Sequence, residues 1–390
     1  NCYICFMNYI LFDDSREDLL PLTFTRPVSQ IRVGILTITE KWEKYLSAKC
    51  SFFTEDYLQQ KFPLNSTQDN CWINGSICPN AELVKAIHSL EENQCLKQDD
   101  TLIAYRSEQG NPEESISFQG SFVRISQLWH IFEYNDVCIK SDFEFLTKGR
   151  KSQAISETNA CTRPENIFIE EGAKVEHAIL NASNGPIYVG KDAEIMEGSI
   201  VRGPLAMCEN SVLKLGAKIY GATTLGPYCK VGGEVNNSVL MGYSNKGHDG
   251  FLGNSVLGEW CNLGADTNNS NLKNNYADVR LWNYSTQRFS NSGLQFCGLI
   301  MADHSKCGIN TMFNTGTVVG VSANIFGAGF PRNFVSSFSW GGAAGYTTYK
   351  LDKVFEVAAK VMQRRSVEFD QIEKDILSTV FELTKSYRKN

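Results

Sequence analysis

The sequence lacks three features that would place it in a broad class directly. No apolar run approaches the ~20 residues that are needed to span a bilayer. The net charge is only −6, and charges of both signs are spread along the chain, so there is no electrostatic footprint for nucleic acid or an anionic membrane. The 13 cysteines follow no framework spacing. We therefore expect a cytoplasmic protein with reduced thiols that binds neither nucleic acid nor membrane.

The opening apolar stretch, residues 1–12, has no basic n-region and no small-residue cleavage site. This pattern favours a first strand behind a short leader over a signal peptide, with Met7 as a candidate start. Cys2 and Cys5 form a single C-x-x-C without a second pair or a nearby histidine. Ordinary thiols are therefore the better interpretation of this pair than a metal or redox site.

Residues 1–150 alternate between strand-like and helix-like segments. Residues 9–12 and 71–75 have the pattern of strands, and residues 80–87 have apolar residues at helical spacing. Residues 39–46 read as a helix with Thr39 as the N-cap. The alternation predicts an α/β domain with a largely parallel sheet over residues 1–150, followed by a polar linker at about residues 149–153.

A different sequence pattern begins near Ile167. An aliphatic residue recurs every six positions, with glycine or a small polar residue beside it, as in residues 187–195 and 215–219. This hexapeptide period is typical of a parallel β-helix, in which each aliphatic side chain points into the coil. We predict such a domain over residues 164–340, with an inserted loop at about 268–292. A C-terminal helix over residues 347–390 is expected to cap the coil.

The most informative segment is Ser-Asn-Lys-Gly-His-Asp-Gly-Phe-Leu-Gly, residues 244–253. It places a single histidine, His248, on a glycine-flanked loop just before the rigid repeat resumes. Histidine as a residue type titrates near neutral pH and is suited to general-base work. The chain has few other histidines, and His88, His130 and His177 belong to no motif, while for His304 a structural corner role is at least as well supported.

These residues resemble the bifunctional GlmU family, which joins an N-acetylglucosamine-1-phosphate uridyltransferase to a glucosamine-1-phosphate N-acetyltransferase. The resemblance is strongest over residues 244–271, where the family has Ser-Lys-x-Gly-His-Leu-Thr-Tyr-Leu-Gly. It points to a divergent branch with a shortened N-terminal domain. The resemblance implies a left-handed coil, acetyl-CoA as co-substrate and a homotrimer. It also implies that His248 is the acetyl-transfer base.

The same resemblance assigns binding residues within the coil. Asn262, Ala265 and Asn271 match positions that contact the sugar or the acyl donor, and Phe251 replaces a tyrosine of the family. Lys230 falls near the basic residues that hold the sugar phosphate. Lys246 has two interpretations. By default it is a solvated loop lysine, and the alternative is a contact with a phosphate or with CoA.

The N-terminal half matches the family less well. Nucleotidyltransferases follow their first strand with a glycine-rich phosphate loop, but here residues 13–18 contain no glycine. The stretch of residues 20–27 resembles the family's Leu-x-Pro-Leu-Thr segment. We take as candidate nucleotide- and phosphate-binding residues Arg26, Arg32, Lys41, Asn74 and Gly75. Mg²⁺ is a candidate cofactor by the same resemblance, and its ligands are not assigned.

The function expected from these observations is transfer of an acyl group from acetyl-CoA to an amino-sugar phosphate on the coil. Transfer of a nucleotide from UTP or dTTP to a sugar 1-phosphate is a candidate second activity of the first domain. Two alternatives remain open: an enzyme that is a nucleotidyltransferase only, and an inactive scaffold that binds a sugar nucleotide. The sequence fixes neither the sugar, the base nor the acyl chain.

Overall fold

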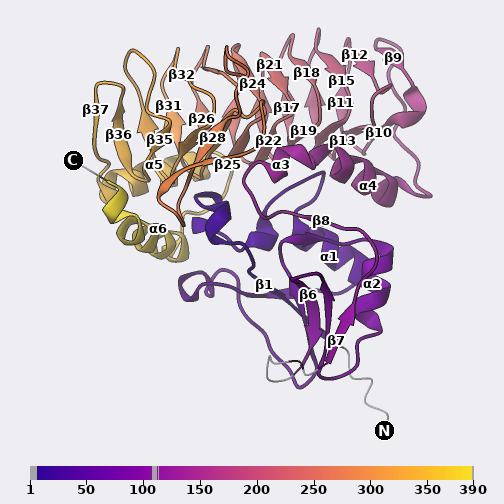
Figure 1. Ribbon diagram of the computed structural model, residues 1–390. Coiled ribbons are helices and arrows are strands. Elements are labelled where there is room, and N and C mark those ends of the chain that lie inside the picture. Colours follow the sequence, from indigo (N-terminus) through magenta and orange to yellow (C-terminus); the bar gives the residue numbers. More distant parts are fainter. Residues whose placement is uncertain (1–6, 108–111, 113, 389–390) are drawn as a thin grey trace. The chain divides into compact units, whose positions relative to one another are not determined.

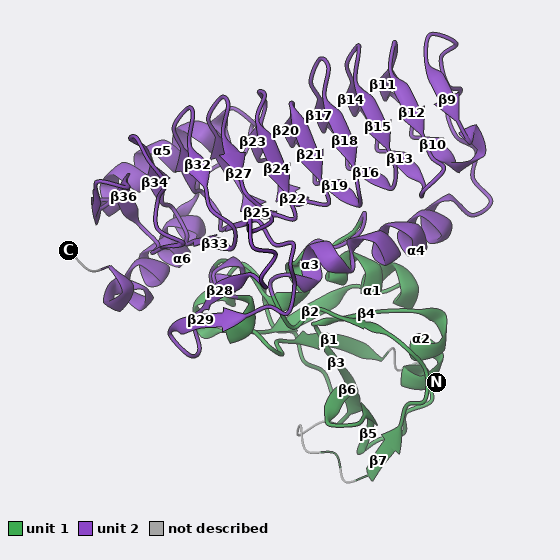
Figure 2. Cartoon of the chain, turned by 45° about the horizontal axis from the view of Figure 1, so that its top comes forward, with its two compact units in different colours: residues 1–19, 25–31, 36–127 green, residues 20–24, 32–35, 128–390 purple. Residues whose placement is uncertain are grey.

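The computed structural model describes residues 7–107, 112 and 114–388, and it is coloured along the sequence in Figure 1. The expected leader and the Cys2–Cys5 pair lie outside the described residues. The chain divides into two compact units, which Figure 2 distinguishes by colour. Unit 1 is formed from residues 1–19, 25–31 and 36–127, and unit 2 from residues 20–24, 32–35 and 128–390.

Unit 1 is built on a mixed six-stranded sheet with two helices. The strand order is β2 (Cys50–Phe53), β1 (Asn8–Phe12), β3 (Asn70–Asn74), β6 (Thr101–Arg106), β5 (Gln94–Gln98) and β7 (Glu114–Ser117). Strands β2, β1 and β3 are parallel, and β6 is antiparallel to both of its neighbours. The helices are α1 (Ile38–Leu46) and α2 (Ala81–His88), and β4 (Ile77–Cys78) pairs with β8 (Val123–Arg124). The α/β class is the one that the sequence predicts, but the sheet is mixed and not largely parallel, because β6 runs antiparallel between β3 and β5.

The N-cap of helix α1 is Thr37, two residues before the N-cap that the sequence suggested. The Thr37 hydroxyl accepts from the Glu40 amide at 3.1 Å, and the Glu40 carboxylate accepts from the Thr37 amide at 2.6 Å, which together make a capping box. The Thr39 hydroxyl instead donates to the Ser29 carbonyl at 3.0 Å. The expected cap, Thr39, therefore ties the first turn of the helix to the preceding segment.

Unit 2 is dominated by a parallel β-solenoid with three faces. The first face is a nine-stranded sheet of β10 (Ile167–Ile169), β13 (Ile187–Val189), β16 (Leu205–Met207), β19 (Thr223–Leu225), β22 (Val239–Gly242), β25 (Val256–Glu259), β30 (Leu299–Met301), β33 (Thr317–Val319) and β35 (Phe334–Val335). The second face is a ten-stranded sheet of β11 (Lys174–Val175), β14 (Glu194–Ile195), β17 (Val212–Leu213), β20 (Lys230–Val231), β23 (Asn245–Lys246), β26 (Asn262–Leu263), β31 (Lys306–Cys307), β34 (Asn324–Ile325), β36 (Ser339–Gly342) and β37 (Gly345–Thr348).

The third face is a six-stranded sheet of β9 (Ala160–Thr162), β12 (Ile179–Asn181), β15 (Ile200–Arg202), β18 (Lys218–Tyr220), β21 (Glu234–Asn236) and β24 (Phe251–Gly253), beyond which β27 (Asn268–Asn269) pairs with β32 (Met312–Phe313). Figure 1 shows the successive coils stacked side by side. Buried aliphatic residues from all three faces fill the interior as one continuous core. The parallel β-helix predicted from the hexapeptide period is confirmed, and its left-handedness remains the expectation of the resemblance.

The interruption of the repeat contains a β-hairpin. Strands β28 (Arg280–Asn283) and β29 (Arg288–Asn291) pair in antiparallel register between β27 and β30. The coil is followed by two helices, α5 (Leu351–Gln363) and α6 (Gln371–Leu383), and by a short 3-10 turn, η6 (Lys385–Tyr387). The sequence predicted one continuous helix here. The break includes Ser366, whose φ of 56° is left-handed and cannot continue an α-helix.

Helices α3 (His130–Glu133) and α4 (Asn135–Thr147) belong to unit 2, so the first compact unit ends before the expected residue 150. The reason lies in polar contacts with other parts of unit 2. The Asn135 amide donates to the Ala222 carbonyl at 2.9 Å, and the Asp142 carboxylate accepts from the Ile35 amide at 2.8 Å. These bonds tie the first residue and the middle of α4 to other segments of unit 2. No helix among the described residues is long and apolar enough to cross a bilayer.

Candidate functional site

A cavity of about 590 Å³ lies in unit 2 on the ten-stranded face of the coil. His248 lines it, together with side chains from β20, β23, β26 and β31 and from the end of α5. The full lining is Lys214, Lys230, Tyr243, Asn245, Gly247, His248, Trp260, Cys261, Asn262, Leu263, Gly264, Ala265, Lys306, Ile309, Val361, Arg364 and Arg365. We call this space the His248 cavity.

The floor of the His248 cavity follows from strand register. Lys230 pairs with Asn245, Asn245 with Asn262, and Asn262 with Lys306 along four adjacent strands. Because alternate residues of a strand point to opposite faces, these four side chains form one outward row. Their successors in the chain point into the core of the coil. Short two-residue strands thus place a row of polar groups at fixed spacing outside a rigid apolar interior.

His248 itself lies on the turn after β23, and its side chain is exposed. The turn is held at its far end. The Asp249 carbonyl accepts from the Asp266 amide at 3.1 Å, and the Gly250 carbonyl accepts from the Glu234 amide at 3.2 Å. Gly250 has a φ of 111°, and a Cβ there would collide with the backbone of Thr267. The loop is therefore a tightly packed feature of the coil that presents the imidazole to the cavity.

Lys246 departs from both sequence expectations, because its side chain points into the coil. Only 1% of it is exposed, and it occupies the inward position that Val231 holds one coil earlier. Its Nζ donates to the carbonyl of Gly232 at 2.9 Å and to the carbonyl of His248 at 2.6 Å. Burial lowers the pKa of Lys246 to about 8, against the opposing effect of Asp249 and Asp266. Lys246 therefore contacts the backbone of the His248 loop and does not line the cavity.

The charge of the cavity is one-sided. Five basic side chains line it and no acidic side chain does: Lys214, Lys230, Lys306, Arg364 and Arg365. The pKa of Lys230 is lowered first by burial and then by the positive charges of Arg365, Lys214 and Arg364. Burial also lowers the pKa of Lys306 to about 8. Repulsion among these cations would be relieved by an anion in the cavity.

Two of these cations are fixed by hydrogen bonds. The Lys306 ammonium donates to the His304 carbonyl at 2.9 Å, and the Arg365 guanidinium donates to the Asn245 side-chain oxygen at 3.2 Å. The second bond joins the residues after α5 to the outward row of the coil. Basic groups that are already held in place lose little conformational entropy when they bind a phosphate.

An aromatic stack borders the same cavity. Tyr228, Tyr243, Trp260 and His304 occupy equivalent corners of the coil, all with positive φ, and their rings stack in sequence. The rings of Tyr243 and Trp260 are the closest, with centroids 4.1 Å apart and planes 15° apart, and both line the cavity. A flat apolar wall thus stands beside the basic groups.

The remaining residues expected on the coil separate into two sets. Asn262 and Ala265 line the His248 cavity, as does Lys230. Phe251 lies on β24 of the six-stranded face, and the Asn271 amide donates to the Asn254 side-chain oxygen at 2.8 Å. Neither of these two lines the cavity. Within a single chain, the structure therefore brings together only part of the set that the resemblance assigned.

Sequence reasoning missed Lys214, Lys306, Trp260 and the pair Arg364–Arg365. A signal existed for Lys306, which follows the same spacing as Lys230 and Asn262 in the outward row. No comparable signal existed for the arginine pair, because it reaches the cavity only through the packing of α5 on the coil.

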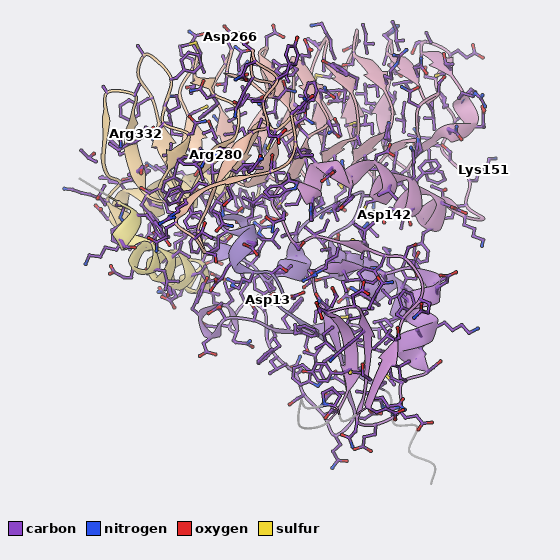
Figure 3. The ribbon with its side chains drawn as sticks, in the orientation of Figure 1. Asp13, Asp142, Lys151, Asp266, Arg280 and Arg332 are labelled. Carbon is purple, nitrogen blue, oxygen red and sulfur yellow. The ribbon has the colours of Figure 1, made fainter. Side chains whose placement is uncertain are left out.

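In unit 1, a polar cluster lies where β1 and β3 end. Asp13, labelled in Figure 3, accepts from the Val28 amide at 2.7 Å and from Arg16 at 2.9 Å. Asp14 accepts from the Asn74 amide and from the Arg124 guanidinium, each at 2.7 Å. The carboxyl ends of parallel strands are the usual ligand-binding edge of an α/β sheet. This edge therefore holds two carboxylates that are each paired with a guanidinium.

Gly75 lies at this edge beside Asn74. A Cβ on Gly75 would stand 2.9 Å from the Phe12 carbonyl oxygen, and the Gly75 amide donates to that oxygen at 2.8 Å. The two residues thus join the ends of β1 and β3. Asn74 is nearly fully buried, and its side-chain amide donates to the Asp14 carboxylate. Its structural role is therefore to hold Asp14 in place.

The three basic residues expected to clamp phosphates are all buried. Arg32, in unit 2, donates to the Met241 carbonyl at 3.1 Å and also to the Ile35 carbonyl. Arg26 and Lys41 are 5% and 3% exposed and make contacts with other protein groups. For Arg32 the physical reason is that backbone carbonyls, which sequence patterns do not reveal, satisfy the guanidinium internally.

The same edge does not offer a ready metal site. Among the described residues, no cluster of three or more His, Cys, Asp and Glu side chains is arranged to hold a metal ion. The two carboxylates at the end of β1 already have guanidinium partners. We therefore derive no step through Mg²⁺. All cysteines within the described ranges are free thiols, as their irregular spacing predicted.

Solved structures with some likeness include a mutant of AntD, an N-acyltransferase from Bacillus cereus, in complex with dTDP and coenzyme A. It is 10% identical over 55% of this chain and 100% of its own, with a TM-score of 0.23. UDP-N-acetylglucosamine acyltransferase from Campylobacter jejuni is 16% identical over 60% of this chain and 83% of its own, with a TM-score of 0.22. The Francisella novicida UDP-N-acetylglucosamine acyltransferase is 13% identical over 60% of this chain and 78% of its own, with a TM-score of 0.20. Scores this low carry no argument about this chain.

In sequence, no curated protein matches the chain. Residues 9–151 match the sequence model of a family that is described as sugar nucleotidyl transferase. The matched region contains the whole sheet of unit 1 and its polar edge, and it covers less than half of the chain.

Proposed function

We propose that the chain is a transferase that moves an acyl group from an acyl-CoA to the amine of an amino-sugar phosphate or amino-sugar nucleotide in the His248 cavity. The observation that carries the proposal is the meeting of one exposed histidine and five basic side chains in one cavity with no acidic side chain. Both reactants bear phosphates, so a cationic cavity favours them. The aromatic wall of Tyr243 and Trp260 suits the adenine ring of CoA.

The chemistry follows from the needs of the amine. The amine must be neutral, and it loses a further proton as its nitrogen forms a bond to the thioester carbonyl carbon. His248 accepts that proton, the carbon–sulfur bond breaks, and the imidazolium returns the proton to the departing thiolate. The products are an amide and free CoA thiol. The rigid coil holds the base in place without reorganisation.

Lys246 supports this role as a positioning residue. A buried ammonium without an acidic hydrogen-bond partner costs stability, and a simple hexapeptide coil would place an aliphatic residue there. Here the ammonium holds the carbonyl of His248 itself. We propose that the cost is tolerated because the bond fixes the loop that carries the base.

A second activity, transfer of a nucleotide to a sugar 1-phosphate, is favoured by the family match of residues 9–151. We place it at the polar edge of unit 1. Arg124 is the expected source of positive charge toward a phosphate, because it is partly exposed and bonded to Asp14 at the carboxyl end of the sheet. If neither UTP nor dTTP reacts, unit 1 is a binding domain only.

Arg124→Ala should lower nucleotidyl transfer by about 10²–10³-fold, because it removes a charged donor near a transferring phosphoryl group. Acyl transfer should be unchanged. The assay is pyrophosphate release from UTP or dTTP with a sugar 1-phosphate. Lys85→Ala, at an exposed position of α2 with no printed bond to this polar cluster, is the control. Equal rates for wild type and Arg124→Ala would contradict the assignment.

We also propose that the chain forms a homotrimer, as the resemblance implies. Ile179 and Ile200 are neighbours in register on the outside of the six-stranded face, and they are 50% and 48% exposed. Exposed apolar neighbours on a flat face favour burial against another copy. Light scattering should give three times the mass of one chain. A stable monomer at micromolar concentration would contradict this proposal.

A further inference from the structure

Unit 2 contains a second cavity of about 290 Å³ at the C-terminal end of the coil. Its walls come from the inserted hairpin β28–β29, from β35, from the β36–β37 hairpin and from η6. The lining residues are Trp282, Gln287, Arg332, Phe334, Val335, Ser336, Ser339, Tyr346, Thr347, Thr348, Ser386, Tyr387 and Arg388. None of them lines the His248 cavity. We call this space the hairpin cavity.

The hairpin cavity is basic and rich in hydroxyl groups. Arg332 and Arg388 line it without any acidic residue, and within the described parts of the chain neither forms an ion pair. Arg388 is braced. Its guanidinium donates to the Thr384 hydroxyl at 2.9 Å and to the Phe381 carbonyl at 2.6 Å. Two guanidiniums among serine and threonine hydroxyls form the donor set that proteins use for phosphate groups.

Another part of the lining is aromatic. The Trp282 ring stacks on the Phe334 ring with centroids 4.3 Å apart and planes 13° apart, and Tyr346 and Tyr387 complete the wall. The Trp282 indole N–H and the Tyr346 hydroxyl are buried and have no hydrogen-bond partner in the structure. A buried donor without a hydrogen-bond partner lowers stability, and acceptor atoms of a ligand would remove that cost.

Arg332 and Tyr346 belong to the same end of this cavity. Burial raises the pKa of Tyr346 to about 12, and the nearby Arg332 opposes that rise. A cation therefore lies near a buried phenol hydroxyl in this cavity. Arg332 is exposed and is labelled in Figure 3.

The size of the cavity narrows the ligand class. It has about half the volume of the His248 cavity, so it suits a smaller molecule than the reactants proposed there. A flat ring would lie against the aromatic wall, and a phosphate would meet the guanidiniums. We propose that the hairpin cavity binds a small organic phosphate with a planar ring, of the nucleoside monophosphate class. This inference does not depend on the proposed acyl transfer.

The test is calorimetric titration of the full chain with four probes: UMP, AMP, uridine and inorganic phosphate. At least one nucleotide should bind at micromolar concentration, and at least tenfold more tightly than uridine or phosphate alone. Arg332→Gln should weaken this binding at least tenfold. Arg280→Gln changes an exposed arginine of the same hairpin that lies outside the cavity, so it should leave binding unchanged.

Two further variants locate the binding event. Lys230→Gln in the His248 cavity and Arg124→Gln in unit 1 should not weaken it, and thermal melts confirm that each variant folds. The proposal is overturned if neither nucleotide binds at millimolar concentration, or if Arg332→Gln binds as wild type does. It is equally overturned if phosphate alone binds as tightly as the nucleotides, because the aromatic wall would then recognise nothing.

Discussion

His248→Ala is expected to lower acetyl-CoA-dependent N-acylation of an amino-sugar phosphate by about 10²–10⁴-fold, the range typical of a lost general base. The coil should remain folded, because the His248 side chain is exposed and contributes little to the core. The measurement is release of free CoA thiol, with circular dichroism to monitor folding.

The matched control is His177→Asn, because His177 is also an exposed turn histidine of the coil and lies outside the cavity. Asparagine suits that position because His177 has a φ of 53°. The control should keep the wild-type rate. If a folded His248→Ala variant also turned over at the wild-type rate, His248 would have no part in the chemistry.

Lys246→Met should produce the second-largest effect. Methionine fills the inward position with an unbranched apolar chain, but it cannot hold the carbonyls of Gly232 and His248. A displacement of about 1 Å in a catalytic group can cost about 10²-fold in rate. We expect kcat to fall by about 10–10²-fold while KM for acetyl-CoA stays the same, because the basic residues of the cavity are untouched. If the variant only contains less active enzyme, and the kcat of that active enzyme equals the wild-type kcat, Lys246 has no positioning role.

Two readouts for Lys246→Met do not require activity. The amides of Asp266 and Glu234, which donate to carbonyls of the His248 loop, should exchange with solvent faster in the variant. In addition, wild type should gain stability relative to the variant as pH rises from about 8 toward 10.5, because the unfolded chain then binds the proton that the buried lysine has lost. Unchanged exchange at both amides would show that Lys246 does not hold the loop.

The sequence predicted the coil well because its signal is local and repeated. Each aliphatic residue of the period reports one inward position, and the structure buries them in one continuous core. The glycine-flanked loop singled out His248, and the resemblance to the GlmU family assigned Asn262 and Ala265, which line the same cavity. The α/β character of the first domain was assigned from strands and helices that are each signalled by nearby residues.

The parts that sequence could not predict depend on packing between distant segments. Lys246 was read as a loop residue because nothing local marks its position as inward, although alignment with Val231 does so once the register is known. Arg364 and Arg365 enter the site only through the packing of α5. Arg32 is buried where its guanidinium donates to backbone carbonyls. One of them belongs to Met241, which is more than 200 residues away in the sequence.

Acyl transfer in the His248 cavity is tested most directly by thiol release from the wild-type chain with acetyl-CoA and glucosamine 1-phosphate, repeated with an amino-sugar nucleotide as acceptor. We expect stoichiometric release of CoA thiol and formation of the N-acetyl product with at least one acceptor, and rates of both that are about 10²–10⁴-fold lower in His248→Ala. Absence of thiol release with every amino-sugar acceptor, from a protein that also fails to bind acetyl-CoA at millimolar concentration, would contradict the central claim that the His248 cavity is an acyl-transfer site.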